Sequence, residues 1–343
     1  MGQKKEWTGK PTLMKELNMG LIRDALAKHP NATRVELSAL TKISQPTVNE
    51  LIRQMRKENV VISLGMAKST GGRKAEVFAL NQKRVLIAAF LVKEACLDYR
   101  VMDLELKQEA SGRVGYVPER AWSVQLVQAV RTVLEEYPYV GVIMVGVPGA
   151  VSAEGEIFAI PQIPEWENYN LKVCLEEAFS LPVIVMNDIN AIAVGHSRSY
   201  HGGTSNMVYV HIGSRGIGAG IVVEGKLYQG FKSFAGEVGY MQLGNTCGNE
   251  EYRKGDLDVR GKHVELIPKI VTNVICVLNP EKIVIGGETM DDGLLEQIRQ
   301  GCLQYLPQEI MPEFLMMQSG TEYYFKGLGE MGKELLNRHI RLV

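Results

Sequence analysis

The charge of this chain is divided unevenly between its two ends. Residues 1–83 contain 15 lysines and arginines against 7 aspartates and glutamates, a net charge of +8. Residues 84–343 contain 23 against 32, a net charge of −9, so the whole chain carries only −1. A basic segment on an acidic body is typical of DNA-binding proteins, because Lys and Arg release counterions condensed on the phosphates. A solvated charged surface would have the same composition, so the order and spacing of the residues must distinguish it from a DNA-binding segment.

Length and composition restrict the class of protein. A chain of 343 residues is long enough for two or three domains. No apolar run approaches the roughly 18–20 residues of a membrane helix, and residues 1–10 lack the apolar core of a signal peptide. The five cysteines are dispersed and form no C-x-x-C pair, which is typical of free thiols in a reducing compartment. We therefore expect a cytoplasmic protein without a membrane segment.

The basic segment has the helix start and stop signals of a helix-turn-helix. Residues 18–28 have apolar side chains at helical spacing and end near Pro30. Thr33 and Glu36 form a capping-box pattern that predicts a second, short helix. The apolar residues available for burial on this second helix are Val35, Leu37 and Leu40.

A third predicted helix begins after Ser44, a residue suited to the N-cap, with Pro46 in its first turn. Its apolar stripe consists of Val48, Leu51, Ile52 and Met55. A separate polar face carries Gln, Asn and Arg, which pair with adenine edges, with guanine or with phosphates. From this helix we predict DNA contacts by Gln45, Thr47, Asn49 and Arg53.

Two short strands, predicted at residues 60–64 and 76–80, complete the N-terminal domain. The segment between them contains Gly71-Gly72, which favours a tight turn, flanked by cations that can reach a groove or a phosphate backbone. From this segment we predict DNA contacts by Lys68, Ser69, Arg73 and Lys74. Three helices and a hairpin indicate a winged helix-turn-helix over residues 1–82. A small helical domain that binds protein, or nothing, is the alternative.

The acidic body mixes strands with helices. We predict paired strands at 84–92 and 97–104, a helix at 121–134 and buried strands at 140–147 and 182–186. A further strand pair is expected at 207–212 and 217–223, and a short strand at 283–285. Glycines at several strand ends indicate an α/β protein with clefts at those ends.

Several motifs in the body are shared with one family. They are Gly146-Val147-Pro148-Gly149, Asn187-Asp188-Ile189-Asn190-Ala191, Gly216-Ile217-Gly218-Ala219-Gly220 and Gly236-Glu237-Val238-Gly239, in this order. With the N-terminal motifs, they make the whole chain resemble the ROK family, and more closely its repressor branch, which includes xylose and N-acetylglucosamine repressors. The resemblance implies that residues 83–343 form a two-lobed, actin-like ATPase body that binds sugar between its lobes.

Two departures from the family pattern bear on chemistry. Family kinases have an Asp-x-Gly-x-Thr phosphate loop, whereas residues 88–94 contain neither glycine nor aspartate. Family members also bind zinc through a His and a cysteine-rich loop, but this chain has Tyr240 at the His position and Cys247 alone in the loop. We therefore expect no kinase activity, no zinc and no cofactor.

The resemblance also implies which residues bind the sugar. Family kinases use the Asp that matches Asp188 as the general base, and the residues that match Asn187 and Glu237 bind other hydroxyl groups. Weaker candidates for the ligand site are Tyr240, Asn168 and Trp166. The alternatives remain open that Asn187 and Asp188 only cap a helix, that Glu237 caps a turn and that Trp166 belongs to the core.

These observations together predict a sugar-responsive DNA-binding regulator. We expect it to repress carbohydrate-utilisation genes as a homodimer whose partners are double-stranded operator DNA and a small sugar or sugar derivative. One alternative is a ROK sugar kinase with an appended DNA-binding domain. The other is a repressor whose body has lost its ligand.

Overall fold

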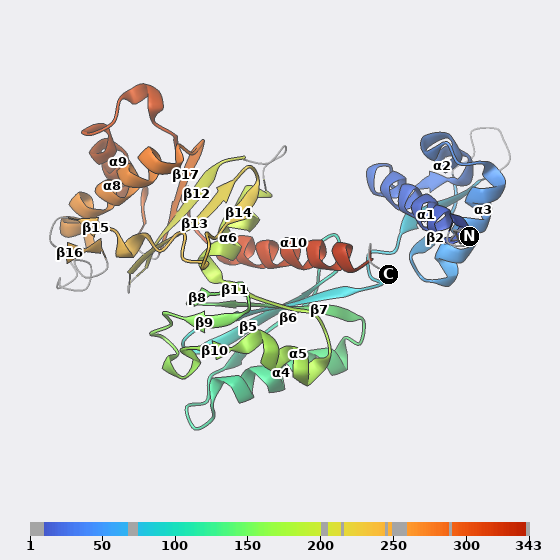
Figure 1. Ribbon diagram of the computed structural model, residues 1–343, viewed down its shortest axis with the longest axis horizontal. Coiled ribbons are helices and arrows are strands. Elements are labelled where there is room, and N and C mark those ends of the chain that lie inside the picture. Colours follow the sequence, from blue (N-terminus) through green and yellow to red (C-terminus); the bar gives the residue numbers. More distant parts are fainter. Residues whose placement is uncertain are drawn as a thin grey trace, which may run out of the picture. The chain divides into compact units, whose positions relative to one another are not determined.

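The computed structural model describes residues 10–67, 75–199, 205–213, 216–243, 246–248, 259–287 and 290–340. They belong to two compact units, Met1–Arg84 and Val85–Val343 (Figure 1). Among the described residues, no helix combines the length and the apolar character required to cross a lipid bilayer.

The first unit consists of three helices and a small antiparallel sheet. The helices are α1 (Lys10–Lys28), α2 (Arg34–Thr41) and α3 (Gln45–Lys57), and the sheet has the order β1 (Ala32–Thr33), β3 (Glu76–Leu80), β2 (Val61–Met66). Thr33 caps α2 with the predicted capping box: its backbone amide donates to Glu36 Oε2 at 2.7 Å and its hydroxyl accepts from the Glu36 amide at 3.3 Å. Ser44 caps α3, as predicted. The element order is that of the expected winged helix-turn-helix.

In the core of the first unit, one face of each helix packs around Phe78 of β3. The buried stripe of α3 is the predicted one, Val48, Leu51, Ile52 and Met55. On α2 the prediction was wrong for two of three residues: Leu37 is fully buried, but Val35 and Leu40 are 59% and 45% exposed. An eight-residue helix turns only a narrow face toward its neighbours, and Leu37 occupies it.

The first lobe of the second unit is built on a five-stranded sheet. Its order is β11 (Val183–Asn187), β7 (Val140–Val147), β4 (Leu86–Val92), β5 (Cys96–Met102), β6 (Gln108–Gly115). Strands β11, β7 and β4 are parallel, and β5 and β6 continue antiparallel. Helices α4 (Trp122–Glu136) and α5 (Leu171–Phe179) lie on one face and α10 (Thr321–Ile340) on the other (Figure 1). The edge strand β6 was not predicted, because its residues are mostly polar and exposed.

The second lobe has another five-stranded sheet, of order β14 (Lys226–Tyr228), β13 (Gly216–Val223), β12 (Met207–Gly213), β17 (Lys282–Gly286), β18 (Glu313–Met317). Helices α8 (Val259–Leu278) and α9 (Asp292–Leu303) pack on one face. Helix α6 (Asp188–Ser197) lies against the other face. The predicted strand pairs and the helix after residue 121 are confirmed.

The remaining elements of the body are short. Strands β8 (Ala150–Val151), β9 (Glu156–Phe158) and β10 (Tyr169–Asn170) form a small antiparallel sheet. Strands β15 (Gln242–Leu243) and β16 (Thr246–Cys247) pair with each other. Three single helical turns are η1 (Pro164–Trp166), η2 (Val238–Tyr240) and η3 (Gln308–Ile310).

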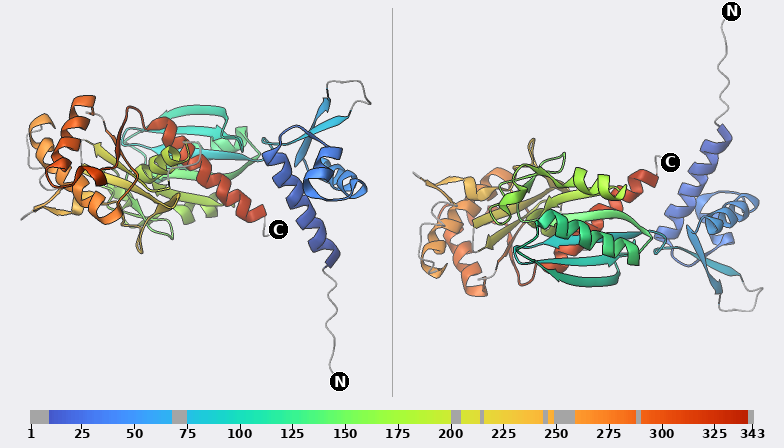
Figure 2. Two further views of the ribbon diagram at one scale, coloured as in Figure 1. Left: turned by 90° about the horizontal axis from the view of Figure 1, so that it is seen from above. Right: turned by 90° about the horizontal axis from the view of Figure 1, so that it is seen from below.

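Helices α6 and α10 run between the two sheets and cross at close range (Figures 1 and 2). A Cβ on Gly195 of α6 would lie 1.8 Å from the carbonyl oxygen of Tyr323, and one on Gly327 of α10 would lie 1.8 Å from that of Ala191. Both positions therefore require glycine. This tight crossing holds α6 so that its N-terminus opens into the space between the lobes.

Candidate functional site

The polar face of α3 forms a cationic groove in the first unit. Gln45, Asn49 and Arg53 are exposed on the side opposite the buried stripe. The groove, of about 730 Å³, is lined by Arg34, Pro46, Asn49, Glu50, Arg53, Arg56 and Lys57. Four cations against one carboxylate give it the charge that phosphate contacts require.

Two of the predicted DNA contacts on α3 already have partners in the protein. The Thr47 hydroxyl lies 2.8 Å from the Ser44 hydroxyl, and its amide donates to the same oxygen at 3.4 Å, so Thr47 helps to cap α3. Arg53 forms an ion pair with Glu50, one turn earlier on the same helix. The Arg53–Glu50 pair is a surface ion pair of low net stability, which DNA can replace.

Arg34 and Arg56 were missing from the predicted set of DNA contacts. Both guanidinium groups bind Glu76 of β3, at 3.0 and 3.1 Å, and lie over the ring of Phe78 at 4.3 and 5.9 Å from its centroid. Hydrogen bonding by Ser63, followed by the two arginines, lowers the pKa of Glu76, opposed by burial. Sequence spacing gave no signal for this cluster, because its members come from three different elements. Lys68, Ser69, Arg73 and Lys74 fall outside the described residues.

The second unit contains a cavity of about 540 Å³ where strand ends and the start of α6 meet. This volume falls in the usual range of small-molecule sites. Its walls come from the segments after β4, β7 and β11, from residues 159–167, from the adjoining ends of β12 and β13 and from η2. Its polar lining residues include Glu94, Gln162, Glu167, Asn187, Asp188, His211, Glu237 and Tyr240.

Asn187 and Asp188 both cap α6 and line the cavity, so the two interpretations of this pair hold together. Asn187 Oδ1 accepts from the Asn190 amide at 3.1 Å, and its Nδ2 donates to the Gly149 carbonyl at 3.0 Å. Asp188 Oδ1 accepts from the Ile189 amide at 2.8 Å. These bonds fix the direction of both side chains.

The carboxyl group of Asp188 is strongly perturbed. Burial raises the pKa of Asp188 to about 6, and the negative charge of Glu237 adds to this, while the Ile189 amide and Lys93 act in the opposite direction. Burial also raises the pKa of Glu237. Two carboxyl groups with raised pKa values in one cavity are the pattern of a polar binding or catalytic site.

Glu237 and Tyr240 lie at the two ends of η2. Glu237 makes no side-chain bond that caps this turn, so its carboxyl group is not explained by capping. Tyr240 is 51% exposed and packs against Phe234 with ring centroids 5.4 Å apart. It lines the cavity, as predicted for a residue near the ligand.

Asn168 was predicted in the ligand site, and the structure does not place it there. It is exposed, absent from the cavity wall and in the left-handed backbone region at φ +58°, which Asn tolerates well. Asn168 belongs to a turn, in which its backbone amide donates to the Ile157 carbonyl at 2.8 Å. Trp166 is only 1% exposed and packs beside Trp122 in the core of the first lobe.

Gln162 and Glu167 line the cavity in the place expected of Asn168. The two oxygens of Glu167 accept from the amides of Ala159 and Ile160, at 3.2 and 3.3 Å. Gln162 Oε1 is buried and has no hydrogen-bond partner. The prolines at 161 and 164 were the only sequence signal that this segment forms a cleft wall.

Comparison with known proteins finds a match to a family profile in each of the two units. The profile of the ROK family matches residues 96–254, and that of a winged helix-turn-helix DNA-binding domain matches residues 22–62. This chain contains a winged helix-turn-helix followed by a ROK domain.

The relatives of the chain include repressors. The xylose repressor of Caldicellulosiruptor bescii is 28% identical over 259 residues, which are 70% of this chain and 63% of that protein. The matched region thus spans less than two thirds of the length of that xylose repressor. The N-acetylglucosamine repressor of Escherichia coli O157:H7 is 26% identical over 364 aligned residues, 86% of each chain.

Solved structures share the fold. A ROK family transcriptional regulator, homologous to the E. coli MLC protein, has a TM-score of 0.70 at 18% identity and covers 95% of this chain and 99% of its own. The ROK hexokinase of Thermus thermophilus has a TM-score of 0.62 at 19% identity, over 74% of this chain and all of the hexokinase. At these identities the likeness establishes the fold of the ROK domain and nothing further.

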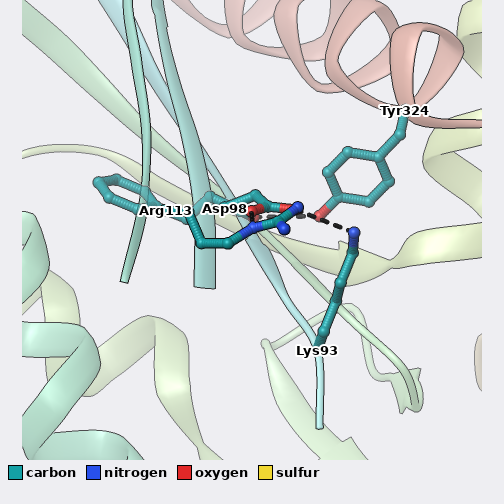
Figure 3. A network of polar contacts seen from close by, with 5 residues as sticks. Lys93, Asp98, Arg113 and Tyr324 are labelled. Carbon is teal, nitrogen blue, oxygen red and sulfur yellow. Dashed lines mark hydrogen bonds and ion pairs between the residues drawn. The ribbon is translucent and has the colours of Figure 1, made fainter. Parts of the chain in front are cut away.

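In this ROK domain, charged side chains lie at and beside the turn after β4, at which the resemblance to family kinases predicts the phosphate loop. Lys93 Nζ donates to Asp98 Oδ2 at 2.9 Å, and Arg113 of β6 binds the same carboxylate (Figure 3). The Arg113 bond, and then Lys93, lower the pKa of Asp98. Tyr324 of α10 donates to the Phe90 carbonyl at 3.0 Å beside this cluster. The lysine that begins the turn is thus ion-paired, while Glu94 and Ala95 are exposed.

Tyr240 and Cys247, which stand where family members have zinc ligands, belong to no metal cluster in the described part of the ROK domain. Tyr240 faces the cavity and Cys247 lies in β16. No group of three or more His, Cys, Asp or Glu side chains with metal-binding geometry occurs among the residues that the structure describes. The absence of zinc stays a prediction, because residues 249–258 lie outside that part.

Proposed function

We propose that this protein is a sugar-responsive, DNA-binding transcriptional regulator that represses carbohydrate-utilisation genes. Residues 1–82 read operator DNA, and residues 83–343 bind the sugar and mediate homodimerisation. The relatives named as xylose and N-acetylglucosamine repressors support this assignment. The protein then acts on DNA and needs no cofactor, and it works in the cytoplasm.

The cavity at the start of α6 is the observation that carries the proposal. Its wall combines Asn187, Asp188 and Glu237, whose amide and carboxylate oxygens suit paired hydrogen bonds to the hydroxyl groups of a sugar. A buried polar wall of this kind rejects ligands that leave its groups unpaired. A body that served only for dimerisation would have no use for a cavity of about 540 Å³ with two perturbed carboxyl groups.

DNA binding follows from the groove on α3. Gln45 and Asn49 offer amide groups for adenine edges, and the surrounding cations offer contacts to phosphates. Sugar bound between the lobes would favour a closed arrangement of the body, and closure in a homodimer would change the placement of its two DNA-reading units. Whether sugar releases or strengthens DNA binding depends on which arrangement matches the operator.

A sugar kinase with an appended DNA-binding domain is the second candidate, favoured by one observation. Asp188 has a pKa of about 6, close to that of an effective general base, and the ROK fold includes hexokinases. Against it stands the turn after β4, where Lys93 and Glu94 occupy the place of a glycine-rich phosphate loop.

Three linked measurements test the proposal. Genomic DNA fragments selected by the purified full-length protein provide the operator. Fluorescence anisotropy then measures operator affinity during titration with pentoses, hexoses and N-acetylhexosamines. An ATP-dependent phosphorylation assay on the same sugars follows. Regulation predicts a change in operator affinity with one sugar and no ATP consumption; sugar-dependent ATP turnover would support the kinase, and specific DNA binding that no sugar alters would support the ligand-less repressor.

A further inference from the structure

A polar cluster in the DNA-binding unit joins two helices to the sheet. Arg34 begins α2, Arg56 belongs to the last turn of α3, and Glu76 begins β3. Glu76 Oε2 lies 3.0 Å from Arg34 Nη1, and Glu76 Oε1 accepts from Arg56 Nη1 at 3.1 Å. Each oxygen of one carboxylate thus binds one arginine. The two guanidinium groups, which come from different helices, therefore converge on a single anion.

The ring of Phe78 supports the same two guanidinium groups. It is fully buried in the core of the unit, and Arg34 and Arg56 lie over it at 4.3 and 5.9 Å from its centroid. A guanidinium over an aromatic face keeps its edge available for hydrogen bonds. The ring and the shared carboxylate restrict both side chains, so less rotamer entropy is lost when an anion binds to them.

The cationic side of this cluster faces the groove on α3. The described residues that line the groove include Arg34 and Arg56 but neither Glu76 nor Phe78. The ion pairs with Glu76 engage Nη1 of each arginine, whereas a guanidinium has five N–H donors. The side chains of Arg34 and Arg56 are 32% and 45% exposed, against 23% for Glu76. Two arginines and one glutamate thus present a net positive charge to the groove.

We infer that Arg34 and Arg56 form one phosphate site, which holds a single backbone phosphodiester of the operator between them. The inference rests on the proposed DNA-binding function and specifies one contact of it. A phosphodiester has one negative charge and two non-bridging oxygens, as has the carboxylate that these arginines already share, and forked guanidinium donors suit it. Asn49 lines the same groove, so a phosphate held here positions α3 for base reading without reading sequence itself.

Uncharged phosphates test this directly in the full-length protein. The probe is the selected operator duplex with one phosphate at a time replaced by methylphosphonate, and fluorescence anisotropy measures its affinity. At one position in each half of the operator, the replacement should weaken wild-type binding by about tenfold or more, as for a lost hydrogen bond to a charged group. At that same position, Arg34→Gln and Arg56→Gln should each reduce the penalty to about threefold or less, because the groups that the phosphate couples to are gone.

Lys28→Gln is the control, because Lys28 is exposed at the end of α1 and is not a lining residue of the groove. It removes the same charge from the same unit and should leave every penalty at its wild-type value. If the two arginine variants lower the penalty at different phosphates, or at none, the shared site is refuted and the proposed function stands.

The lysine variants Arg34→Lys and Arg56→Lys replace any glutamine variant that circular dichroism shows to be unfolded. They keep the charge but lose the planar fork, so the penalty should still fall at the one shared position. A full wild-type penalty in both lysine variants overturns the site. A protein that selects no DNA at all overturns the proposed DNA-binding function, and the site with it.

Discussion

Replacing Asp188 by asparagine should remove the response to sugar and leave operator binding intact. In the structure, Asp188 Oδ1 accepts from the Ile189 amide at 2.8 Å, and asparagine can keep this bond through its own oxygen. The second carboxylate oxygen then becomes an NH₂ group, so a sugar hydroxyl that donated to it meets another donor. Loss of one hydrogen bond to a charged group costs about 1.5–3 kcal/mol. The dissociation constant of the sugar should therefore rise by about 10- to 150-fold.

The pKa of Asp188 supplies an internal check that the variant is folded. The folded-state pKa of about 6 lies above the usual 3.8, so the ionised carboxyl group destabilises the body. Stability contributed by the protonated form is complete below about pH 4 and is lost as the pH rises through 6. Asp188→Asn should thus be more stable than the wild type at pH 8, by up to about 3 kcal/mol, and the difference should vanish near pH 4. Urea unfolding followed by tryptophan fluorescence measures this, since Trp122 and Trp166 report on the first lobe.

The decisive assay is operator anisotropy titrated with the cognate sugar for the wild type, Asp188→Asn and a control. Asp292→Asn is suited as the control, because Asp292 is exposed at the start of α9 and away from the cavity wall. If Asp188→Asn responds at the same sugar concentration as the other two, Asp188 is only a helix residue and the ligand lies elsewhere. If it binds no operator at all, the separation of DNA reading from sugar sensing is wrong.

The remaining predictions concern DNA contacts and pH. Arg73→Ala should lower operator affinity and reduce its salt dependence by about one phosphate contact; equal binding at several salt concentrations would exclude the wing. Gln45→Ala and Asn49→Ala should each cost about 1–3 kcal/mol on the operator and little on random DNA, and equal losses on both would contradict base readout. Sugar affinity should weaken as the pH falls through about 6, because protonated Asp188 accepts fewer hydrogen bonds; calorimetry at pH 5, 6 and 8 would reveal a flat profile if this is wrong.

Local signals predicted the first unit well. The capping box of Thr33 and Glu36 and the stripe around Val48 depend on contacts three or four residues apart, which a sequence displays directly. The prediction of the buried residues of α2 was wrong for Val35 and Leu40, because the sequence does not show which side of a short helix packs against its neighbours. The cluster of Arg34, Arg56 and Glu76 was not predicted either, because its residues come from different elements and meet only in the folded unit.

The residues that line the cavity were predicted where they stand at a strand end and missed where they belong to a loop. Asn187 ends β11 and Asp188 follows it, and the parallel strands of the sheet bring both residues to the cavity. The segment from Pro161 to Asn168 has no regular period, so its direction comes from tertiary contacts. There Gln162 and Glu167 face the cavity, whereas Asn168 turns to solvent.

The same carboxyl group would serve a kinase and a sensor, so Asp188 alone does not distinguish them. Phosphoryl transfer needs, in addition, a loop whose backbone amides approach a triphosphate closely, which glycines permit. In this ROK domain the turn after β4 carries the side chains of Lys93 and Glu94, and Lys93 is held by Asp98. The turn after β4 therefore favours the sensor over the kinase, while Asp188 and Glu237 still line the cavity.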